Sequence, residues 1–315
     1  LTACAIAREL GIWHEGDQVL AGEELSAMTE EQLSGVIEET TVFARVSPSD
    51  KLKIVRAFRR RGHITAMTGD GVNDAPAVKE ADIGVSMGIS GTDVTKEASD
   101  LILMDDNFAT LVSAVKEGRV IYQNIRKFIR YLLSCNIGEV LTMFLGILMG
   151  LPVVLLPIHI LLINLVTDGL PAIALGLEPA EKDVMKRPPR RASDGIFAGG
   201  LLTTILFRGA LIGLTTLAVF LHFYQTGDLA LARTGAFLAL VFAQLIHVFE
   251  CRSEEKTIFG INPFRNVKLI FAVLISASIA LAAVFFPPAR LIFRTVPLNG
   301  EQLLAVAGYL AAAPI

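Results

Sequence analysis

Cysteine is scarce in this sequence of 315 residues, and its three copies form no motif. Cys4, Cys135 and Cys251 lie far apart without a Cys-x-x-Cys pair, which argues against both a disulfide framework and a zinc site. An excess of charge of one sign is also lacking, because 28 Lys and Arg stand against 31 Asp and Glu. With a net charge of −3, the chain gives no reason to expect nucleic acid as a partner.

The beginning of the chain lacks an initiator methionine and a secretory signal. It opens at Leu1 with LTACAIAREL, which has the pattern of an amphipathic helix already under way, without the basic start and long apolar region of a signal peptide. The other end, AVAGYLAAAPI, stops inside an apolar run. We therefore expect a fragment that is cut at both ends.

Apolar residues are abundant but unevenly spread. They make up 53% of the chain against 19% charged residues, yet residues 1–131 carry charge at the density of an ordinary globular domain. A membrane-spanning helix needs ~20 apolar residues. The apolar runs lie near 132–151, 155–177, 199–224, 235–251, 267–286 and from 301 to the end. The fourth is short and the last incomplete, so residues 132–315 are expected to form an all-α transmembrane bundle with about five full spans and the start of a sixth.

The first part of the chain alternates between helical and strand-like segments. The helical patterns lie at 2–10, 22–39 and 50–61, and the β-rich runs are Thr41–Ala44, Ile64–Met67, Ile83–Ser86 and Leu101–Met104. Strands separated by helices predict a parallel α/β sheet, whose ligands gather at the carboxyl ends of the strands. We assign residues 1–107 to this domain. A helical pattern without proline then leads from Phe108 into the first apolar run, and residues 108–131 are expected to form a stalk.

Basic residues alternate between the segments that connect the apolar runs. They cluster before the first run and in the loops 178–198 and 252–266, whereas 152–157 contains none and 225–234 only Arg233. By the positive-inside rule, residues 1–131 and the two basic loops lie on the cytoplasmic side. The lipid bilayer is thus an expected partner of this multi-pass chain, and in a prokaryote the membrane would be the plasma membrane.

Two carboxylates stand alone inside the first two apolar runs. Glu139 and Asp168 are the only charged residues between positions 132 and 177, so no Lys or Arg is present to pair with them. The polar side chains that share a helix face with one of them are Asn136, Asn164 and Thr167. Ionised groups at this depth normally face a partner, a cavity or a transported ion, and oxygen ligands with two negative charges suit Ca²⁺. The alternative is that these groups only hydrogen-bond helix to helix.

The stretch TGDGVNDAP follows directly after a predicted buried strand. Gly69 and Gly71 would let the backbone turn tightly, Asp70 can ligate Mg²⁺, and Asp74 can orient a neighbouring group. Lys51, at the start of a predicted helix, could reach the same strand edge and neutralise a phosphoryl oxygen. The same residues also fit an ordinary turn before a helix, with Asp74 as its N-cap.

Several longer stretches resemble a known family. TGDGVNDAP, the upstream FARVSPSDKLKIV and the downstream DDNFATLVSAVKEGRVIYQNIRKFIRY strongly resemble a P-type cation-transporting ATPase. CNIGEV and INLVTDGLPAIALGLEPAEKDVMKRPPR resemble its calcium-pump branch, the sarcoplasmic-reticulum and secretory-pathway type. The resemblance covers nearly the whole chain and is most specific from about 42 to 191.

The resemblance implies a haloacid-dehalogenase-like, Rossmann-like phosphorylation domain and ATP-driven Ca²⁺ transport through an aspartyl phosphate. Asp70 then resembles the Mg²⁺ ligand, Asn73 and Asp74 its hinge-loop supports, and Lys51 the lysine that contacts the phosphorylated centre. The residues that match the family's ligands for the transported Ca²⁺ are Asn136, Glu139, Asn164, Thr167 and Asp168. Glu254, in CRSEEK, is a candidate for a further ligand.

Several elements of the family pattern are missing from this sequence. Its only Asp-Lys pair, Asp50-Lys51, is followed by Leu-Lys, so the nucleophile of a DKTGT motif is absent. A TGE-type dephosphorylation motif, the ATP-binding insert and the first four spans are absent as well. We therefore expect the amino-terminal part of the same pump to be a partner, and this fragment to be inactive alone. The alternatives are a P-type pump for Mn²⁺, Na⁺ or H⁺, and a non-catalytic membrane module.

Overall fold

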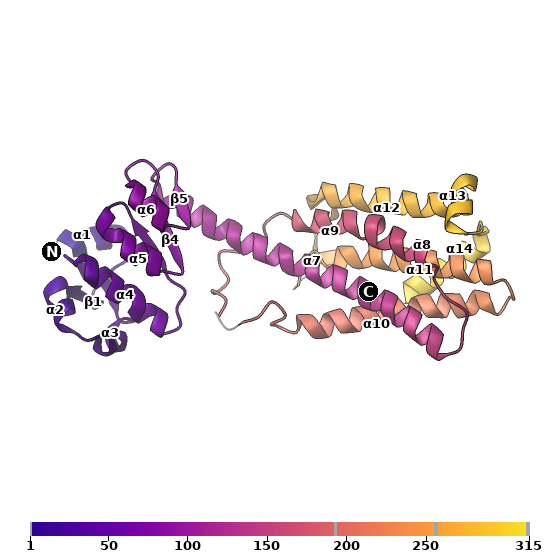
Figure 1. The fold of residues 1–315 in the computed structure, drawn as a ribbon, viewed down its shortest axis with the longest axis horizontal. Coiled ribbons are helices and arrows are strands. Elements are labelled where there is room, and N and C mark those ends of the chain that lie inside the picture. The colour runs from indigo at the N-terminus through magenta and orange to yellow at the C-terminus, as the bar shows by residue number, and fades with distance from the viewer. Residues whose placement is uncertain (1, 192–193, 255–257, 313–315) are drawn as a thin grey trace. The chain divides into compact units, whose positions relative to one another are not determined.

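The computed structural model describes residues 2–191, 194–254 and 258–312. The chain divides into two compact units, one up to Lys116 and one from Glu117 onward, apart from a short segment that begins at Pro189 and groups with the first. Within the described residues, the strands all belong to the first unit and the second unit is helical (Figure 1).

The first unit alternates helices with parallel strands. Its elements are α1 (Thr2–Glu9), β1 (Gln18–Ala21), α2 (Gly22–Ala27), α3 (Glu30–Val36), β2 (Thr40–Ala44), α4 (Pro48–Arg60), β3 (Ala66–Gly69), η1 (Val72–Asp74), α5 (Ala75–Glu80), β4 (Ile83–Met87), α6 (Asp93–Ala98) and β5 (Leu101–Leu103). β1 pairs with β2, and β3, β4 and β5 form a second sheet in that order, all in parallel. The loops that follow β3, β4 and β5 therefore lie at one edge of this sheet, where a parallel α/β fold places its ligands.

Three local expectations differ from the structure. The helix predicted at 22–39 is two helices, α2 and α3, because Thr29 begins a new one: its hydroxyl accepts from the N–H of Gln32 while the Gln32 side chain accepts from the N–H of Thr29. The strand predicted at Ile64–Met67 is β3, two residues later, and Ile64 is exposed rather than buried. Strand β1 was not predicted, although it pairs with β2 along its length.

The second unit is a helical bundle. Its elements are α8 (Pro157–Leu162), η2 (Ile163–Thr167), α9 (Gly169–Gly176), α10 (Leu201–Tyr224), α11 (Leu229–Glu250), η3 (Ile258–Gly260), η4 (Pro263–Arg265), α12 (Val267–Phe285), α13 (Pro287–Phe293) and α14 (Gly300–Ala312). Helix α7 (Phe108–Leu148) is unbroken at Gly118 and contains both the predicted stalk and the first apolar run.

Five helical stretches in the described residues are long and apolar enough to cross a membrane. They are Phe108–Leu148, Pro157–Gly176, Leu201–Tyr224, Leu229–Glu250 and Val267–Phe285. The fourth is longer than the predicted 235–251 because α11 already begins at Leu229, where the Asp228 carboxylate accepts from the N–H groups of Ala230 and Leu231. The predicted α/β domain followed by an all-α transmembrane bundle is confirmed.

Glycines allow α7 and α10 to approach closely. A Cβ at Gly209 would lie 2.6 Å from Cγ2 of Ile137, and one at Gly213 would lie 2.8 Å from the carbonyl oxygen of Gly138. Thr142 stabilises the same contact between the two helices, since its hydroxyl donates a hydrogen bond of 3.2 Å to the carbonyl oxygen of Gly213. Small residues that bring helix backbones together are the usual means of helix association in membranes. This contact fixes the part of α7 that carries Glu139.

Candidate functional site

The turn after β3 is shaped by a close approach of its backbone to Asp74. A Cβ at Gly69 would lie 2.5 Å from the Cβ of Asp74, so a larger residue does not fit there. Gly71 has a φ of −106°, and a Cβ there would have no neighbour nearer than 3.9 Å. Gly71 does begin the tight turn, since its carbonyl accepts from the N–H of Asp74 at 2.9 Å. Glycine is required only at Gly69, where the reason is space rather than a left-handed backbone.

Lys51 and Asp74 form an ion pair at the carboxyl edge of the sheet. The Nζ of Lys51 lies 2.5 Å from Oδ1 of Asp74. Lys51 sits in the first turn of α4, whose start is fixed by Pro48 and by the hydroxyl of Ser47, which accepts from the N–H of Asp50. Asp74 occupies the N-cap position of α5, and Pro76 lies in the first turn, as expected for a turn before a helix; the Asp74 side chain, however, makes no capping hydrogen bond.

The pKa of Asp74 reflects this pairing. Asp74 is buried, and burial acts to raise the pKa of its carboxyl. The hydrogen bond from Lys51 and the charge of its ammonium group, together with backbone hydrogen bonds in the turn, outweigh burial and lower the pKa. Asp74 is therefore ionised at neutral pH and holds the Lys51 ammonium at the sheet edge.

Asp70 and Asn73 lie on the exposed side of the same turn. The backbone of the turn is tied to the start of α6, because the Asp70 carbonyl accepts from the N–H of Thr92 at 2.9 Å and the Gly71 carbonyl accepts from the hydroxyl of Thr95 at 2.8 Å. The Asp70 carboxylate forms no hydrogen bond or ion pair within the part of the chain that the structure describes. An exposed carboxylate on a fixed backbone fits a hard, oxygen-ligated cation such as Mg²⁺.

Asp106 is an element of this edge that the sequence analysis did not single out. It follows β5 with a φ of 50°, a left-handed conformation that Asp tolerates better than most residues. Its carboxylate accepts from the N–H of Ile89 at 2.9 Å and of Ser90 at 2.8 Å. The first of these bonds is the main cause that lowers the pKa of Asp106 to about 2. The loop after β4 is thereby held to the loop after β5.

Glu139 and Asp168 are buried in the second unit, with exposed fractions of 5% and 1%. The Glu139 carboxylate accepts from the side-chain amide of Asn164 at 2.9 Å and from that of Gln244 at 3.0 Å. Oδ1 of Asp168 accepts from the hydroxyl of Tyr131 at 3.1 Å. Within the described residues, neither carboxylate forms an ion pair with a basic side chain.

The helix that carries Asp168 is locally widened. Residues Ile163–Thr167 form a π-helical turn, in which the N–H of Asp168 donates to the carbonyl of Ile163, five residues back, at 2.9 Å. Three residues later Pro171 has no N–H, so the carbonyl of Thr167 lacks its usual partner four residues on. Widened turns of this kind are frequent at functional sites. The widened turn lies before Gly169, and the carbonyl without its usual partner follows from Pro171 after it.

Two buried oxygen atoms at this site, one of them in the Asp168 carboxylate, have no hydrogen-bond donor. Oδ2 of Asp168 and Oε1 of Gln244 form no hydrogen bond within the described residues. An unsatisfied buried polar atom costs about 1–3 kcal/mol, so native structures seldom retain one without a purpose. A hard cation would satisfy oxygens of this kind directly.

The remaining predicted ligands are less closely gathered. Asn136 and Asn164 are exposed in this chain, and Asn136 donates to the carbonyl of Leu132 on its own helix at 2.9 Å. Thr167 is buried but donates to Ile163, also on its own helix. The structure thus brings Glu139 and Asn164 into contact. In the described chain no cluster of three His, Cys, Asp or Glu side chains forms a metal site, so a cation would depend on amide, hydroxyl and carbonyl oxygens as well.

Gln244 and Tyr131 are the contacts that sequence reasoning missed. The only signal that Gln244 gives in the sequence is a lone amide in the apolar middle of α11. Glu254, the candidate for a further ligand, is paired elsewhere: its two carboxylate oxygens accept from the Nε and a terminal nitrogen of Arg126 at 2.8 and 2.9 Å.

Two family models match this chain. Residues 152–315 match the family described as cation transporting ATPase, C-terminus, and residues 2–82 match the family described as haloacid dehalogenase-like hydrolase. The second match agrees with the parallel α/β organisation of the first unit.

Individual relatives point the same way. A calcium-transporting ATPase of Bacillus subtilis (strain 168) is 55% identical over 98% of this chain and 35% of its own length. Calcium-transporting ATPase 1 of Bacillus cereus is 48% identical over 93% of this chain and 35% of its own length. The calcium-transporting ATPase type 2C member 1 of Homo sapiens is 42% identical over 98% of this chain and 34% of its own length. The chain spans about a third of the length of these relatives.

Proposed function

Since this chain belongs to the cation-transporting ATPases, we propose that it forms part of an ATP-driven pump that moves Ca²⁺ across a membrane. The observation that carries the proposal is the pair of buried carboxylates, Glu139 and Asp168, whose partners are neutral amides and a hydroxyl. Two negative charges among neutral oxygen donors suit a hard divalent cation. The names of the relatives as calcium-transporting ATPases support Ca²⁺ as that cation.

The first unit is proposed to contribute to the phosphorylation site. Lys51, oriented by Asp74, places a positive charge at the sheet edge, where it would stabilise charge on a phosphoryl group carried by an aspartate outside this chain. Asp70 would hold Mg²⁺, while Gly69, Gly71 and Asn73 shape the turn that presents it. When bound, Mg²⁺ supplies positive charge that offsets the charge on phosphoryl oxygens.

The second unit is proposed to hold the transported ion. Glu139 and Asp168 would supply negative charge, with oxygens from Asn136, Asn164 and Thr167 completing the ligand set. Transport requires that the ion bind two states of the protein unequally. Helix α7 carries Glu139 and runs unbroken from Phe108, directly after the loop that contains Asp106. A conformational change in that loop would therefore be transmitted to Glu139 through one continuous helix.

The proposed orientation places residues 1–131 and the loops 178–198 and 252–266 on the cytoplasmic side, on the ground of their basic residues. Five helical stretches of spanning length support a multi-pass integral membrane protein.

ATP-dependent uptake of radioactive Ca²⁺ into inside-out vesicles tests the function in the full-length protein that contains this chain. We expect saturable uptake in the native protein, loss of uptake in Glu139→Gln and Asp168→Asn, and unchanged uptake in Glu301→Gln, whose exposed carboxylate lies in the first turn of α14. ATP-dependent uptake of Mn²⁺, Na⁺ or H⁺ without uptake of Ca²⁺ would support an ATP-driven pump but contradict Ca²⁺ as the transported ion. No ATP-dependent uptake of any of these ions would identify a non-catalytic membrane module.

A further inference from the structure

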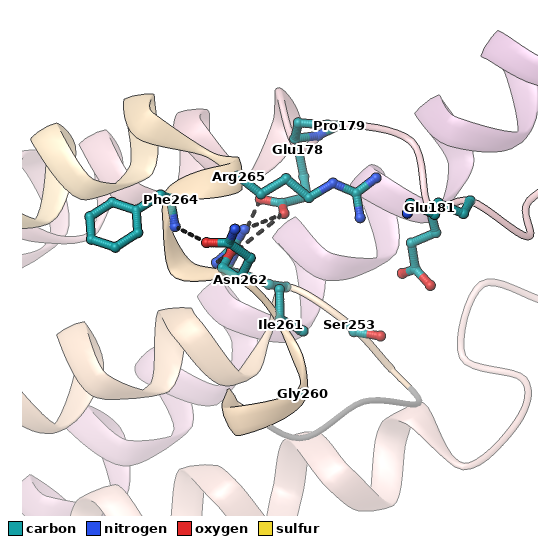
Figure 2. A pocket seen from close by; sticks show the side chains of 11 residues that line it. Glu178, Pro179, Glu181, Ser253, Gly260, Ile261, Asn262, Phe264 and Arg265 are labelled. Atoms are coloured by element: carbon teal, nitrogen blue, oxygen red, sulfur yellow. Dashed lines mark hydrogen bonds and ion pairs between the residues drawn. The ribbon is translucent and has the colours of Figure 1, made fainter.

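A pocket of about 530 Å³ lies where three apolar helices of the second unit end (Figure 2). Its walls come from the segment after α9, the segment after α11 and the segment before α12. These helices end at Gly176 and Glu250 and begin at Val267, so the pocket lies at the border between the spans and their connecting loops. The site is separate from the buried carboxylates discussed above.

The floor of the pocket is a closed network of charged groups. Glu178 accepts from the guanidinium of Arg252 at 2.9 Å and from the side-chain amide of Asn266 at 2.7 Å. The other terminal nitrogen of Arg252 donates to the carbonyl oxygens of Asn262 and Pro263. Arg252 and Glu178 are almost wholly buried, at 3% and 5% exposed. Their charges therefore compensate one another and give the pocket a rigid base.

The second acidic residue in the wall is also compensated. Glu181 pairs with Lys127 at 3.4 Å and with Arg187 at 2.8 Å. Two cations in the wall have no acidic partner within the described residues. Lys182 is exposed and forms no ion pair, and the guanidinium of Arg265 donates to the carbonyl of Ala180. The wall thus carries positive charge in excess, which suits an anion.

The surroundings of the pocket are apolar on the side of the spans. Phe264 is 73% exposed, and its ring points away from Glu178 (Figure 2). Along α12, which follows, Val267, Phe271 and Leu274 are exposed at spacings of four and three residues and share one face of the helix. An aromatic ring at the end of a span and an apolar stripe below it are features of a surface that faces lipid.

We propose that this pocket binds the phosphate-bearing headgroup of an anionic phospholipid, with Lys182 and Arg265 as the contacts to the phosphate. The acyl chains would lie along the exposed face of α12. Basic pockets between spans are the usual sites for anionic headgroups, and each basic residue near a membrane surface contributes about 1 kcal/mol, or about fivefold in affinity. A soluble phosphate would use the same two cations but would gain nothing from the apolar stripe.

Native mass spectrometry of the full-length protein in detergent tests this assignment. The probes are phosphatidylglycerol and phosphatidylcholine with the same acyl chains. We expect phosphatidylglycerol to bind in preference, and its affinity to fall about fivefold in Lys182→Gln and about 25-fold in Lys182→Gln with Arg265→Gln. Lys186→Gln is the matched control, because Lys186 is exposed in the same loop but does not line the pocket, and it should leave lipid binding unchanged.

Inorganic phosphate and glycerol 3-phosphate distinguish a lipid from a free anion. If inorganic phosphate or glycerol 3-phosphate displaces phosphatidylglycerol when present at a concentration similar to that of the lipid, the site binds a soluble anion and the proposal is wrong. The proposal is also wrong if binding does not depend on the acyl chains. Equal binding of the lipid by the native protein and by Lys182→Gln would also overturn it. The side chain of Lys182 is exposed and forms no hydrogen bond or ion pair within the described residues, so Lys182→Gln should fold as the native protein does. This single variant therefore decides the test even where the double variant is unstable.

Discussion

Removing the Lys51 charge should loosen the turn that carries Asp70 and Asp74. In Lys51→Met the stem of the side chain is largely retained, but the Asp74 carboxylate loses the ammonium that lies 2.5 Å away. The side chain of Asp74 is 11% exposed and that of Lys51 33%, so the carboxylate is left mostly buried but within reach of water. The cost is therefore closer to that of an unsatisfied polar group, about 1–3 kcal/mol, than to that of breaking a fully buried ion pair.

Hydrogen exchange in the full-length protein measures this cost locally. A loss of about 1–3 kcal/mol should make the amides of Asp74, Ala75, Ala77 and Val78 exchange about 5- to 150-fold faster. Asp74→Asn in the same background should restore much of the protection, because it removes the unpaired charge. Lys79→Met, which removes an exposed lysine from α5, serves as the control. If Lys51→Met and Lys79→Met give the same exchange rates, the ion pair does not hold the turn.

Four further predictions follow from individual contacts. The pKa of Asp74 is lowered in the folded state, so its stabilising effect is present above the unfolded value of about 3.9 and is lost as pH falls through the lower folded value. Over that range the amides of Asp74, Ala75, Ala77 and Val78 should lose protection, relative to their intrinsic exchange rates, in the native protein but not in Lys51→Met. The folded pKa of Asp106 is about 2, so the amides of Ile89 and Ser90 should stay protected at pH 4, whereas Asp106→Ala should expose both at neutral pH, as exchange at these two positions can show. Gly209→Ala should destabilise the protein by about 1–3 kcal/mol through contact with Ile137, measured by thermal unfolding in detergent, whereas Gly308→Ala, with open space around it, should not. Gln244→Ala should lower the apparent Ca²⁺ affinity in vesicle uptake, because it removes both the donor to Glu139 and a buried unpaired oxygen; unchanged affinity would assign Gln244 to packing alone.

The general fold followed from the sequence because its signals are local and strong. Apolar runs of spanning length, and strands separated by helical patterns, report on burial without reference to distant residues. Boundaries depended on weaker signals. The break between α2 and α3 depends on one capping box, at Thr29 and Gln32, inside a continuous helical pattern. Strand β1 has four residues, and it is recognised as a strand only through its pairing with β2.

The candidate sites were predictable where neighbours in sequence share a face, and less so where the contact crosses between elements. Glu139 and Asp168 are conspicuous because charge is rare in apolar runs. The hydrogen bond from Gln244 to Glu139 joins positions 105 residues apart, so no local sequence pattern predicts it. Glu254 carried the right chemistry for a ligand, but its partner, Arg126, is 128 residues away in the chain.

Formation of the phosphoenzyme from labelled ATP tests the central claim most directly. The full-length protein in membranes would be assayed against free Ca²⁺, Mn²⁺ and Na⁺, with Asp168→Asn beside the native protein and Glu301→Gln as the control. We predict labelling that rises with Ca²⁺ in the micromolar range, disappears in Asp168→Asn and persists in Glu301→Gln. Labelling that rises with Ca²⁺ equally in Asp168→Asn would contradict the assignment of the buried carboxylates to the transported ion.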